Sequence, residues 1–235
     1  MGVMHKLWYA GECSMDYGLY ISGDQAFDAP ERDVENIQID GRNGDLIIDK
    51  GRYKNITIAY PCFIRDRFRV HSGNARAWLC APIGYQRLED TYNRDYFRQA
   101  RFYGPLNFDV HLLRAGECEI TFDCKPQRFL KSGEYPVEIT AGALHNPTRF
   151  PAMPLIKVYG TAAGNLNISG TAVQIKSIAS YVMIDSDTQN AYKGTENKNG
   201  TIVADAFPVL KPGANPISWS GGITRVEITP RWWTL

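Results

Sequence analysis

The chain has 235 residues, of which 44% are hydrophobic and 22% are charged, and its formal net charge is +1. This length allows one large domain, or two of ordinary size, with a substantial buried core. The nearly balanced charge excludes a strong general attraction to nucleic acid or to anionic membranes. Because no apolar run approaches the ~18–20 residues that a membrane helix needs, we expect no membrane insertion.

The N-terminal stretch and the cysteines indicate the same compartment. Residues 1–14 lack the apolar core of a signal peptide, so we expect no signal peptide and synthesis in a cytoplasm. Two of the cysteines, Cys118 and Cys124, share one strand face but are too far apart along it to form a disulfide. We expect all the cysteines to be reduced and mostly buried. They are Cys13, Cys62, Cys80, Cys118 and Cys124.

The first sixty residues predict short strands. Apolar residues alternate over 17–21 and again over 37–39. An Asp-Gly and an Asn-Gly dipeptide then follow within residues 40–44, and the next aliphatic pair stands at 47–48. Turn dipeptides in this position predict a tight connection between two strands. Another strand is expected over 55–60.

The pattern becomes helical after residue 64. The firmest part of the predicted helix is 74–80, with Asn74 as N-cap, because Gly73 weakens the preceding half. Residues 85–90 and 96–103 predict a hairpin, with a helix over 95–101 as the competing interpretation. Further strands are expected over 106–114 and 118–124.

A polar connection spans residues 122–137. Pro126 cannot donate a hydrogen bond to a sheet, and Gly133 allows the chain to turn. We therefore expect the strand to end near Pro126 and a domain boundary near Gly133. The predicted domains are residues 1–133 and residues 134–235.

Beyond this connection, short strands recur between glycine-containing or Asp-rich turns, which is typical of a β-sandwich. The predicted strands are 137–140, 155–159, 166–169, 172–175, 181–184, 201–204, 217–219 and 225–228.

The sequence offers no constellation for catalysis, for a cofactor or for a metal. The four histidines are not spaced as metal ligands, and no nucleophile-elbow, Walker or dinucleotide motif occurs. Glu117 and Glu119 fit a solvated strand face. Residues 185–196 approach a calcium-loop pattern, but Asn190 replaces the required glycine and Lys193 replaces an oxygen ligand. We therefore predict an ordinary polar turn there and no enzyme activity.

Aromatic residues of the second half allow two interpretations. Exposed rings on a β-sandwich stack on sugars, whereas buried rings only fill the core and cover the chain end. The aromatic residues concerned are Tyr159, Tyr181, Tyr192, Trp219, Trp232 and Trp233.

Several stretches, in order along nearly the whole chain, carry a resemblance to one family. They are PERDVENIQIDGRNGDL (30–46), WLC…GYQRLED (78–90), ITFDCKP (120–126), HNPTRFPAMPLIKVYG (145–160), MIDSDTQNAYK (183–193), FPVLKPGANPISWSG (207–221) and VEITPRWW (226–233). Together they resemble the distal tail protein (Dit) family of long, flexible-tailed (siphovirus-type) bacteriophages.

The resemblance implies a mainly β protein: a ring-forming N-terminal β-sandwich with one helix and a protruding hairpin, then a galectin-like β-sandwich. It implies a hexameric ring at the distal end of the virion tail, which joins the tail tube protein to the tail-tip or tail-associated lysin protein. DNA passes through its lumen without specific binding, and the outward domains carry receptor-binding proteins.

The first half of the chain suits such contacts. Residues 1–133 hold 18 Lys and Arg, 13 of them Arg, against 8 and 3 in residues 134–235. Arginine mixed with aromatic residues is typical of interface anchors, although a well-solvated surface is the plain alternative. The residues predicted to take part in self-association, all from the expected hairpin, are Arg87, Arg94, Phe97, Arg98 and Arg101.

Two functions thus remain open from the sequence. The first is a structural ring that links the tail tube to the tail tip. The alternative is a carbohydrate-binding module for recognition of the host surface. A cell-wall hydrolase is disfavoured, since it would need a catalytic motif that the sequence does not contain.

Overall fold

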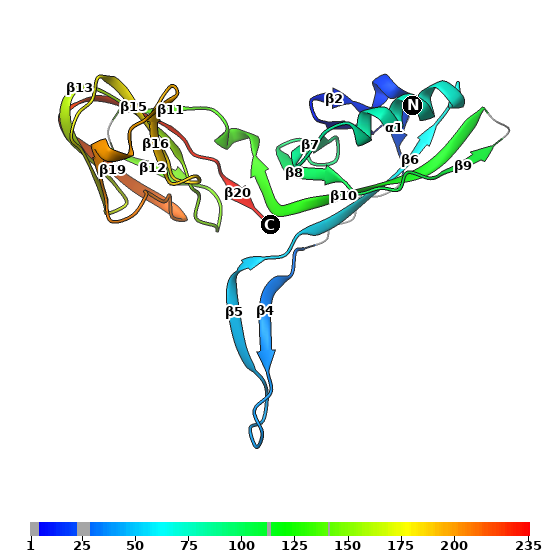
Figure 1. Cartoon of the computed structure of the whole chain (residues 1–235), viewed down its shortest axis with the longest axis horizontal. Helices are drawn as coiled ribbons and strands as arrows, with labels where there is room; N and C mark the ends of the chain where they lie inside the picture. The colour runs from blue at the N-terminus through cyan, green and yellow to red at the C-terminus, as the bar shows by residue number, and fades with distance from the viewer. Residues whose placement is uncertain (1–4, 23–28, 112–113, 141) are drawn as a thin grey trace. The chain divides into compact units, whose positions relative to one another are not determined.

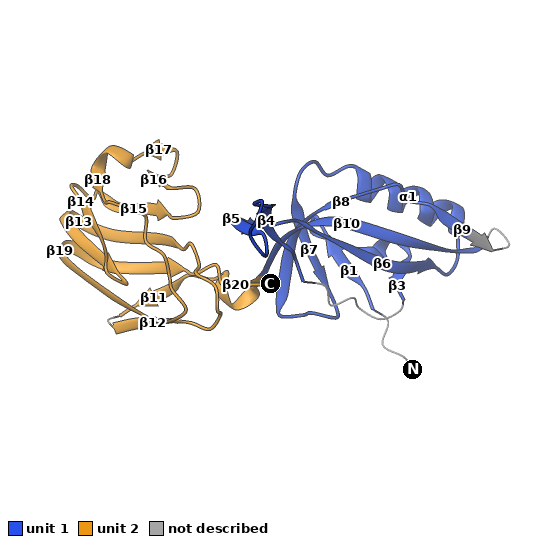
Figure 2. Ribbon diagram, turned by 90° about the horizontal axis from the view of Figure 1, so that it is seen from below, with its two compact units in different colours: residues 1–128, 235 blue, residues 129–234 orange. Residues whose placement is uncertain are grey.

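The structure, a computed structural model, describes residues 5–22, 29–111, 114–140 and 142–235. The chain divides into two compact units, one formed by residues 1–128 with Leu235 and the other by residues 129–234 (Figure 2). The predicted mainly β architecture is confirmed. In the described residues, one α-helix accompanies the strands (Figure 1).

Unit 1 is built on one large sheet. Along it the strands follow the order β2-β1-β7-β8-β10-β6-β3, and β9 pairs with the start of β10. Their bounds are β1 (Leu7–Tyr9), β2 (Glu12–Cys13), β3 (Leu19–Ile21), β6 (Ile56–Ile64), β7 (Gln86–Asp90), β8 (Tyr96–Phe102), β9 (Phe108–His111) and β10 (Ala115–Leu130).

Helix α1 (Phe68–Cys80) packs against one side of this sheet. Trp78 and Leu79 are buried there, and burial of each contributes roughly 1.5–3 kcal/mol. The indole N–H of Trp78 donates to the Tyr9 carbonyl at 3.1 Å. Tyr17 was expected in a strand, but it lies in the 3-10 helix η1 (Ser14–Tyr17), where its ring stacks on Trp78 at 4.8 Å.

The predicted start of α1 was wrong. The helix begins at Phe68, six residues before Asn74, and Gly73 lies inside it. Phe68 is buried and meets the Phe108 ring edge to face at 5.3 Å. This tertiary packing outweighs the weak intrinsic helix propensity of Gly73.

Both predicted hairpins are present. Strands β4 (Arg32–Ile37) and β5 (Leu46–Tyr53) form a two-stranded sheet of their own (Figure 1). Strands β7 and β8 pair with Leu88 opposite Arg98, which excludes the competing helix over 95–101. The β7–β8 hairpin does not stand free, because β7 also pairs with β1 and β8 adjoins β10.

The expected end of the strand at Pro126 was also wrong. Strand β10 continues through Pro126 to Leu130, and the 3-10 helix η2 (Lys131–Gly133) follows. The pairing of β10 with β6 stops at Cys124 opposite Ile56. Pro126 therefore lies beyond β6, where its missing N–H removes no hydrogen bond to that strand.

Unit 2 consists of two layers that share two long strands. The first half of β13 (Leu155–Ile168) pairs with β15 (Ser180–Asp185) and its second half with β14 (Thr171–Ile175). The first half of β19 (Gly213–Thr229) pairs with β12 (Gly142–Asn146), and its last part pairs with β11 (Val137–Ile139). Strands β13 and β19 also pair with each other along most of their length. The core lies between the layers and includes Ile156, Leu166, Val182 and Ile228.

The bounds in unit 2 are β11 (Val137–Ile139), β12 (Gly142–Asn146), β13 (Leu155–Ile168), β14 (Thr171–Ile175), β15 (Ser180–Asp185), β16 (Asn190–Lys193), β17 (Glu196–Asn197), β18 (Ile202–Val203), β19 (Gly213–Thr229) and β20 (Trp233–Thr234), with the 3-10 helix η3 at Asn199–Thr201.

Two pairs of predicted strands are single strands in the structure. Residues 155–159 and 166–169 belong to β13, and residues 217–219 and 225–228 belong to β19. The register between β13 and β19 shifts at Gly160 and Gly164. A Cβ at Gly164 would lie 2.6 Å from the Ser220 carbonyl oxygen. These glycines therefore permit an irregularity and close strand contact where the sequence suggested turns.

Candidate functional site

The five residues predicted for self-association do not form one patch. Side chains alternate between the two sides of a strand, and Ala100 of β8 is buried in the core on the α1 side. Arg98 therefore lies on the α1 side of the sheet. Phe97 and Arg101 lie on the opposite side, which we call the open side.

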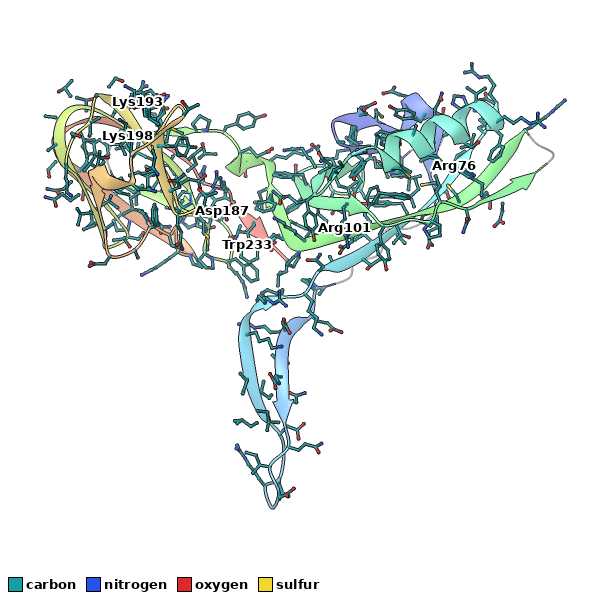
Figure 3. The ribbon with its side chains drawn as sticks, viewed as in Figure 1. Arg76, Arg101, Asp187, Lys193, Lys198 and Trp233 are labelled. Carbon is teal, nitrogen blue, oxygen red and sulfur yellow. The ribbon has the colours of Figure 1, made fainter. Side chains whose placement is uncertain are left out.

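Two of the predicted arginines already have partners within unit 1. The Arg87 guanidinium lies 3.9 Å from the Phe97 ring centroid and pairs with Glu89. Arg101, labelled in Figure 3, donates its Nε–H to Asp123 at 2.7 Å. Arg94 is exposed in the connection between β7 and β8. A partner that contacts Arg87 or Arg101 must therefore compete with, or extend, an existing ion pair.

Arg98 has a different environment. Its Nη1 atom is buried without a hydrogen-bond partner among the described residues, and partial burial lowers the pKa of this guanidinium. The neighbouring Tyr60 hydroxyl donates to Asp90 at 2.8 Å. Since Arg98 lies beside this buried pair, its position suits a structural role within the unit better than an exposed contact.

The β4–β5 hairpin is a surface that the sequence reasoning did not single out. Its strands pair only with each other among the described strands, so each has an unpaired edge. Isolated two-stranded hairpins are marginally stable in water. Its exposed large aliphatic residues are Val34, Ile37, Ile39, Leu46, Ile47 and Ile48. The sequence signal was six aliphatic residues around two turn dipeptides.

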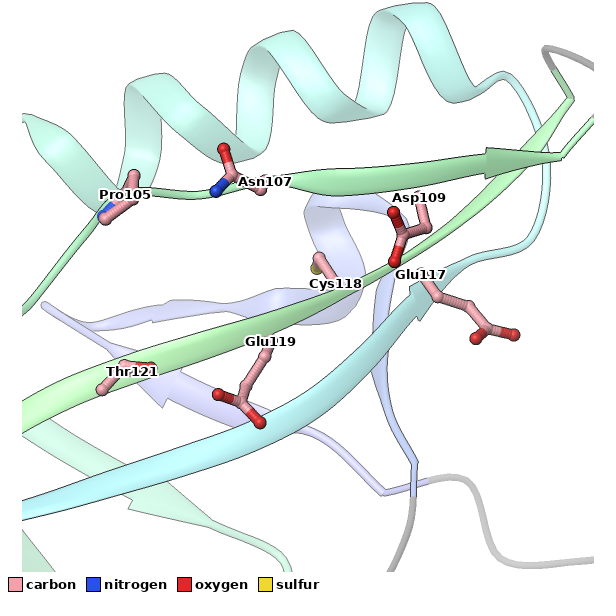
Figure 4. A pocket seen from close by; sticks show the side chains of 7 residues that line it. All are labelled: Pro105, Asn107, Asp109, Glu117, Cys118, Glu119 and Thr121. Atoms are coloured by element: carbon pink, nitrogen blue, oxygen red, sulfur yellow. The ribbon is translucent and has the colours of Figure 1, made fainter.

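A shallow acidic pocket of about 440 Å³ lies at β9 and β10 (Figure 4). Its carboxylates come from Asp109, which opposes Glu117 in the sheet, and from Glu117 and Glu119. The last two face the open side, since Ile120 and Phe122 face the core. Among the described residues, no group of His, Cys, Asp or Glu is arranged to hold a metal ion.

Most of the aromatic residues considered for sugar stacking are engaged within unit 2. Trp232 is buried, and Trp233 stacks on Phe150 at 4.5 Å. The Arg225 guanidinium lies 4.1 Å from the Tyr159 ring centroid, and Lys157 lies 4.7 Å from that of Tyr181. Cations over both tyrosine rings leave little free ring surface for a sugar.

The loop that resembled a calcium site is a polar turn. Asp185 is buried and forms a bidentate ion pair with Arg231, at 2.6 and 3.1 Å. Its Oδ1 also accepts the backbone N–H of Asp187 at 3.0 Å. The Asp185 carboxylate therefore fixes the C-terminal segment of unit 2, whose Trp232 carbonyl accepts the Leu130 N–H at 2.8 Å.

The cysteines are all free, and two of them face each other across β6 and β10. A hydrogen bond with Cys118, together with burial, raises the pKa of Cys62. Burial also raises the pKa of Cys124, to about 12. The cysteines were expected to be mostly buried: Cys62 and Cys124 are buried and Cys13 and Cys118 are partly buried, whereas Cys80, at the end of α1, is exposed.

No helix in the described part of the chain combines the length and the apolar character that a crossing of the bilayer requires.

Among the comparisons with known proteins, the comparison with solved structures finds a match. No family model matches the sequence, and no curated protein does. The crystal structure of the SPP1 Dit protein (gp 19.1) superposes with a TM-score of 0.78 at 11% identity, over 98% of this chain and 99% of that one. That protein is described as a paradigm of the hub of the adsorption apparatus in phages that infect Gram-positive bacteria. The chain thus has a Dit-like fold.

Proposed function

We propose that this chain is a structural protein of the distal tail of a long, flexible-tailed bacteriophage. The observation that carries the proposal is the superposition on the SPP1 Dit protein over 98% of the chain, which includes both units. A fold by itself does not fix a function. The ordered sequence stretches that resemble the same family are separate support, because they rest on the residues themselves and not on the fold.

The proposed assembly is a ring of six copies formed by the first domain, predicted as residues 1–133. Each copy in a head-to-tail ring needs two different complementary surfaces. The β4–β5 hairpin supports this assembly, since burial of its exposed aliphatic residues would stabilise a ribbon that is marginal by itself. Arg94 and Arg101 are candidates for the rim of such a contact, where exposed charges guide association.

The proposed partners follow from the position of such a ring. One side of the ring would meet the tail tube protein, and the other the tail-tip or tail-associated lysin protein. DNA would pass through the lumen without specific binding. The second domain, predicted as the galectin-like residues 134–235, would face outward and present receptor-binding proteins. The site of action would be the virion tail, after synthesis in the bacterial cytoplasm.

The test is the oligomeric state of the purified chain, measured by light scattering and by negative-stain electron microscopy over a range of concentrations. Six-fold rings with a central channel are expected, either for the chain alone or after addition of the tail-tip protein. Monomers at every concentration, with the tail-tip protein present as well, would contradict the proposal.

A carbohydrate-binding module remains the alternative, although the cations over Tyr159 and Tyr181 disfavour it. Calorimetry with purified host cell-wall glycans distinguishes the two functions. We expect no heat of binding for the chain. Binding that is lost in Trp233→Ala or Tyr181→Ala would favour the alternative.

A further inference from the structure

Unit 1 carries two groups of opposite charge without ion-pair partners among the described residues. The acidic patch consists of Asp109, Glu117 and Glu119 at the pocket of β9 and β10. The basic patch consists of Arg65, Arg67 and Arg69, which are exposed at the start of α1. Asp66, which stands between Arg65 and Arg67 in the sequence, lies 3.6 Å from His71.

The two patches lie on opposite sides of the sheet. Glu117 and Glu119 are on the open side, and Figure 4 shows their side chains extending away from α1. Helix α1 covers the other side with Phe68, Trp78 and Leu79. Arg65, Arg67 and Arg69 are exposed at the start of this helix, whereas Arg76 is not part of the patch because its guanidinium lies 5.7 Å from the ring centroid of Phe108 in β9.

Within one molecule, β10 and the buried core separate Glu117 and Glu119 from the arginines at the start of α1. A packed core does not deform to allow their contact. In a second copy, the same patches are available and complementary. Contact between two different surfaces of identical chains is head-to-tail, the type of interface that generates rings or filaments.

The solvent side of α1 also has a shape that suits close contact. Gly73 and Ala77 are exposed between Arg69 and Cys80, and a Cβ at Gly73 would meet no atom within 4 Å. The charges thus border a surface that holds these small residues beside the exposed Val70 side chain. Opposite charges placed across such a contact would align the two copies and accelerate their association.

We infer that the solvent side of α1 of one copy docks, through the basic patch, on the acidic patch of a second copy. This inference rests on the proposed ring and specifies one of its contacts. The other possible occupant of the basic patch is the phosphate backbone of DNA, which the test separates from a second copy.

The experiment is a charge exchange in the full chain. Variant A is Glu117→Lys with Glu119→Lys, variant B is Arg65→Glu with Arg69→Glu, and variant AB combines all four changes. A and B should each raise the concentration for half-assembly by about tenfold or more, because like charges would then face each other. AB should restore assembly, and mixtures of A with B should assemble through their matched patches.

The matched control exchanges two exposed charges of unit 2, Asp205→Lys and Lys211→Glu, and should assemble like the unchanged chain. Circular dichroism and thermal melting exclude misfolding, since the exchanged residues of A, B and the control are exposed.

Rings of the unchanged chain that persist equally in A and B would overturn the docking contact while leaving the proposed function intact. Failure of the unchanged chain to assemble, even with the tail-tip protein, would overturn both. Loss of binding to a fluorescent DNA duplex in B, with normal assembly, would assign the basic patch to DNA and overturn the contact between copies.

Discussion

The two units bury their sheets in different ways. In unit 2, strands β13 and β19 take part in both layers, and the side chains between the layers are enclosed by the unit itself. In unit 1, α1 covers one side of the sheet, and the open side carries exposed residues such as Thr57, Pro61 and Glu119. Unit 2 is complete as a sandwich, whereas unit 1 keeps a sheet side and an aliphatic hairpin available for contacts.

The largest expected change in the free energy of unfolding comes from a substitution in the closely packed strands of unit 2. Gly160→Val would place side-chain atoms against the Gly222 carbonyl group, where the backbones of β13 and β19 meet. We expect a loss of about 3 kcal/mol or more in the free energy of unfolding, because the backbone cannot yield without breaking strand pairing. Denaturant unfolding measures it.

The matched control is Gly200→Ala, at an exposed position where a Cβ would meet no atom within 4 Å. It should change the free energy of unfolding by no more than about 0.5 kcal/mol. Equal stability of the two variants would refute the close approach of the long strands.

The next effect concerns the buried ion pair of unit 2. Burial alone would raise the pKa of Asp185, but Arg231 and the backbone N–H groups of Asp187 and Thr188 outweigh it and lower the pKa. The ionised carboxylate therefore contributes stability above about pH 4, the ordinary Asp range, and this contribution disappears as the pH falls through the lowered pKa. Asp185→Asn should cost about 2 kcal/mol at neutral pH.

Chemical unfolding at pH 7 and at pH 3 checks this expectation. The difference between Asp185→Asn and the unchanged chain should narrow at the lower pH, because Asp185 of the unfolded chain, with its ordinary pKa, takes up a proton before the native carboxylate does. Asp187→Asn, at an exposed neighbour, is the control. A difference that stays constant with pH would show that the ionised form of Asp185 adds nothing.

A smaller effect on stability is expected in the hairpin of unit 1. Ile47→Ser with Ile48→Ser removes exposed aliphatic surface, so the free energy of unfolding of the monomer should change by about 0.5 kcal/mol or less. Assembly should weaken strongly in the same variant, because those residues would be buried between copies. A large loss of monomer stability would instead mean that the hairpin packs on its own unit.

The last prediction concerns the reactivity of cysteines and not stability. It compares Cys80, at the exposed end of α1, with the cysteines on the side of the sheet that α1 covers. Cys80 is exposed, whereas Cys62 and Cys124 are buried with raised pKa values. Since the thiolate is the reactive form, iodoacetamide at pH 8 should label Cys80 first and the buried pair last. Peptide mass mapping over time gives the order. Early labelling of Cys124 would indicate that the covered side opens readily.

Local signals in the sequence were sufficient where one short stretch determines the structure. The two turn dipeptides within residues 40–44 predicted the β4–β5 hairpin, and alternation predicted the central part of β10. Local signals were not sufficient where the structure depends on contact with a segment that is distant in the sequence. A glycine such as Gly160 or Gly164 is equally compatible with a turn and with an irregular strand. Only the close approach of β19 shows that these two glycines lie in an irregular strand.

The candidate site shows the same limit. The hairpin composition indicated arginines and an aromatic residue, but only the pairing of β7 with β8 places Arg98 on the covered side and Phe97 on the open side. The acidic patch depends on β9 lying beside β10, a pairing that the sequence did not specify. The role of the five residues in self-association stays a prediction.

The long strands of unit 2 also set the order in which it folds. Leu155 pairs with Thr229, and Ile168 pairs with Ile217, so the central ladder joins segments dozens of residues apart. Such non-local pairing must close a long loop before any contact compensates for the lost chain entropy, and folding is correspondingly slow. During synthesis, the sandwich cannot close until β19 has left the ribosome, by which time the strands of unit 1 are already available to pair.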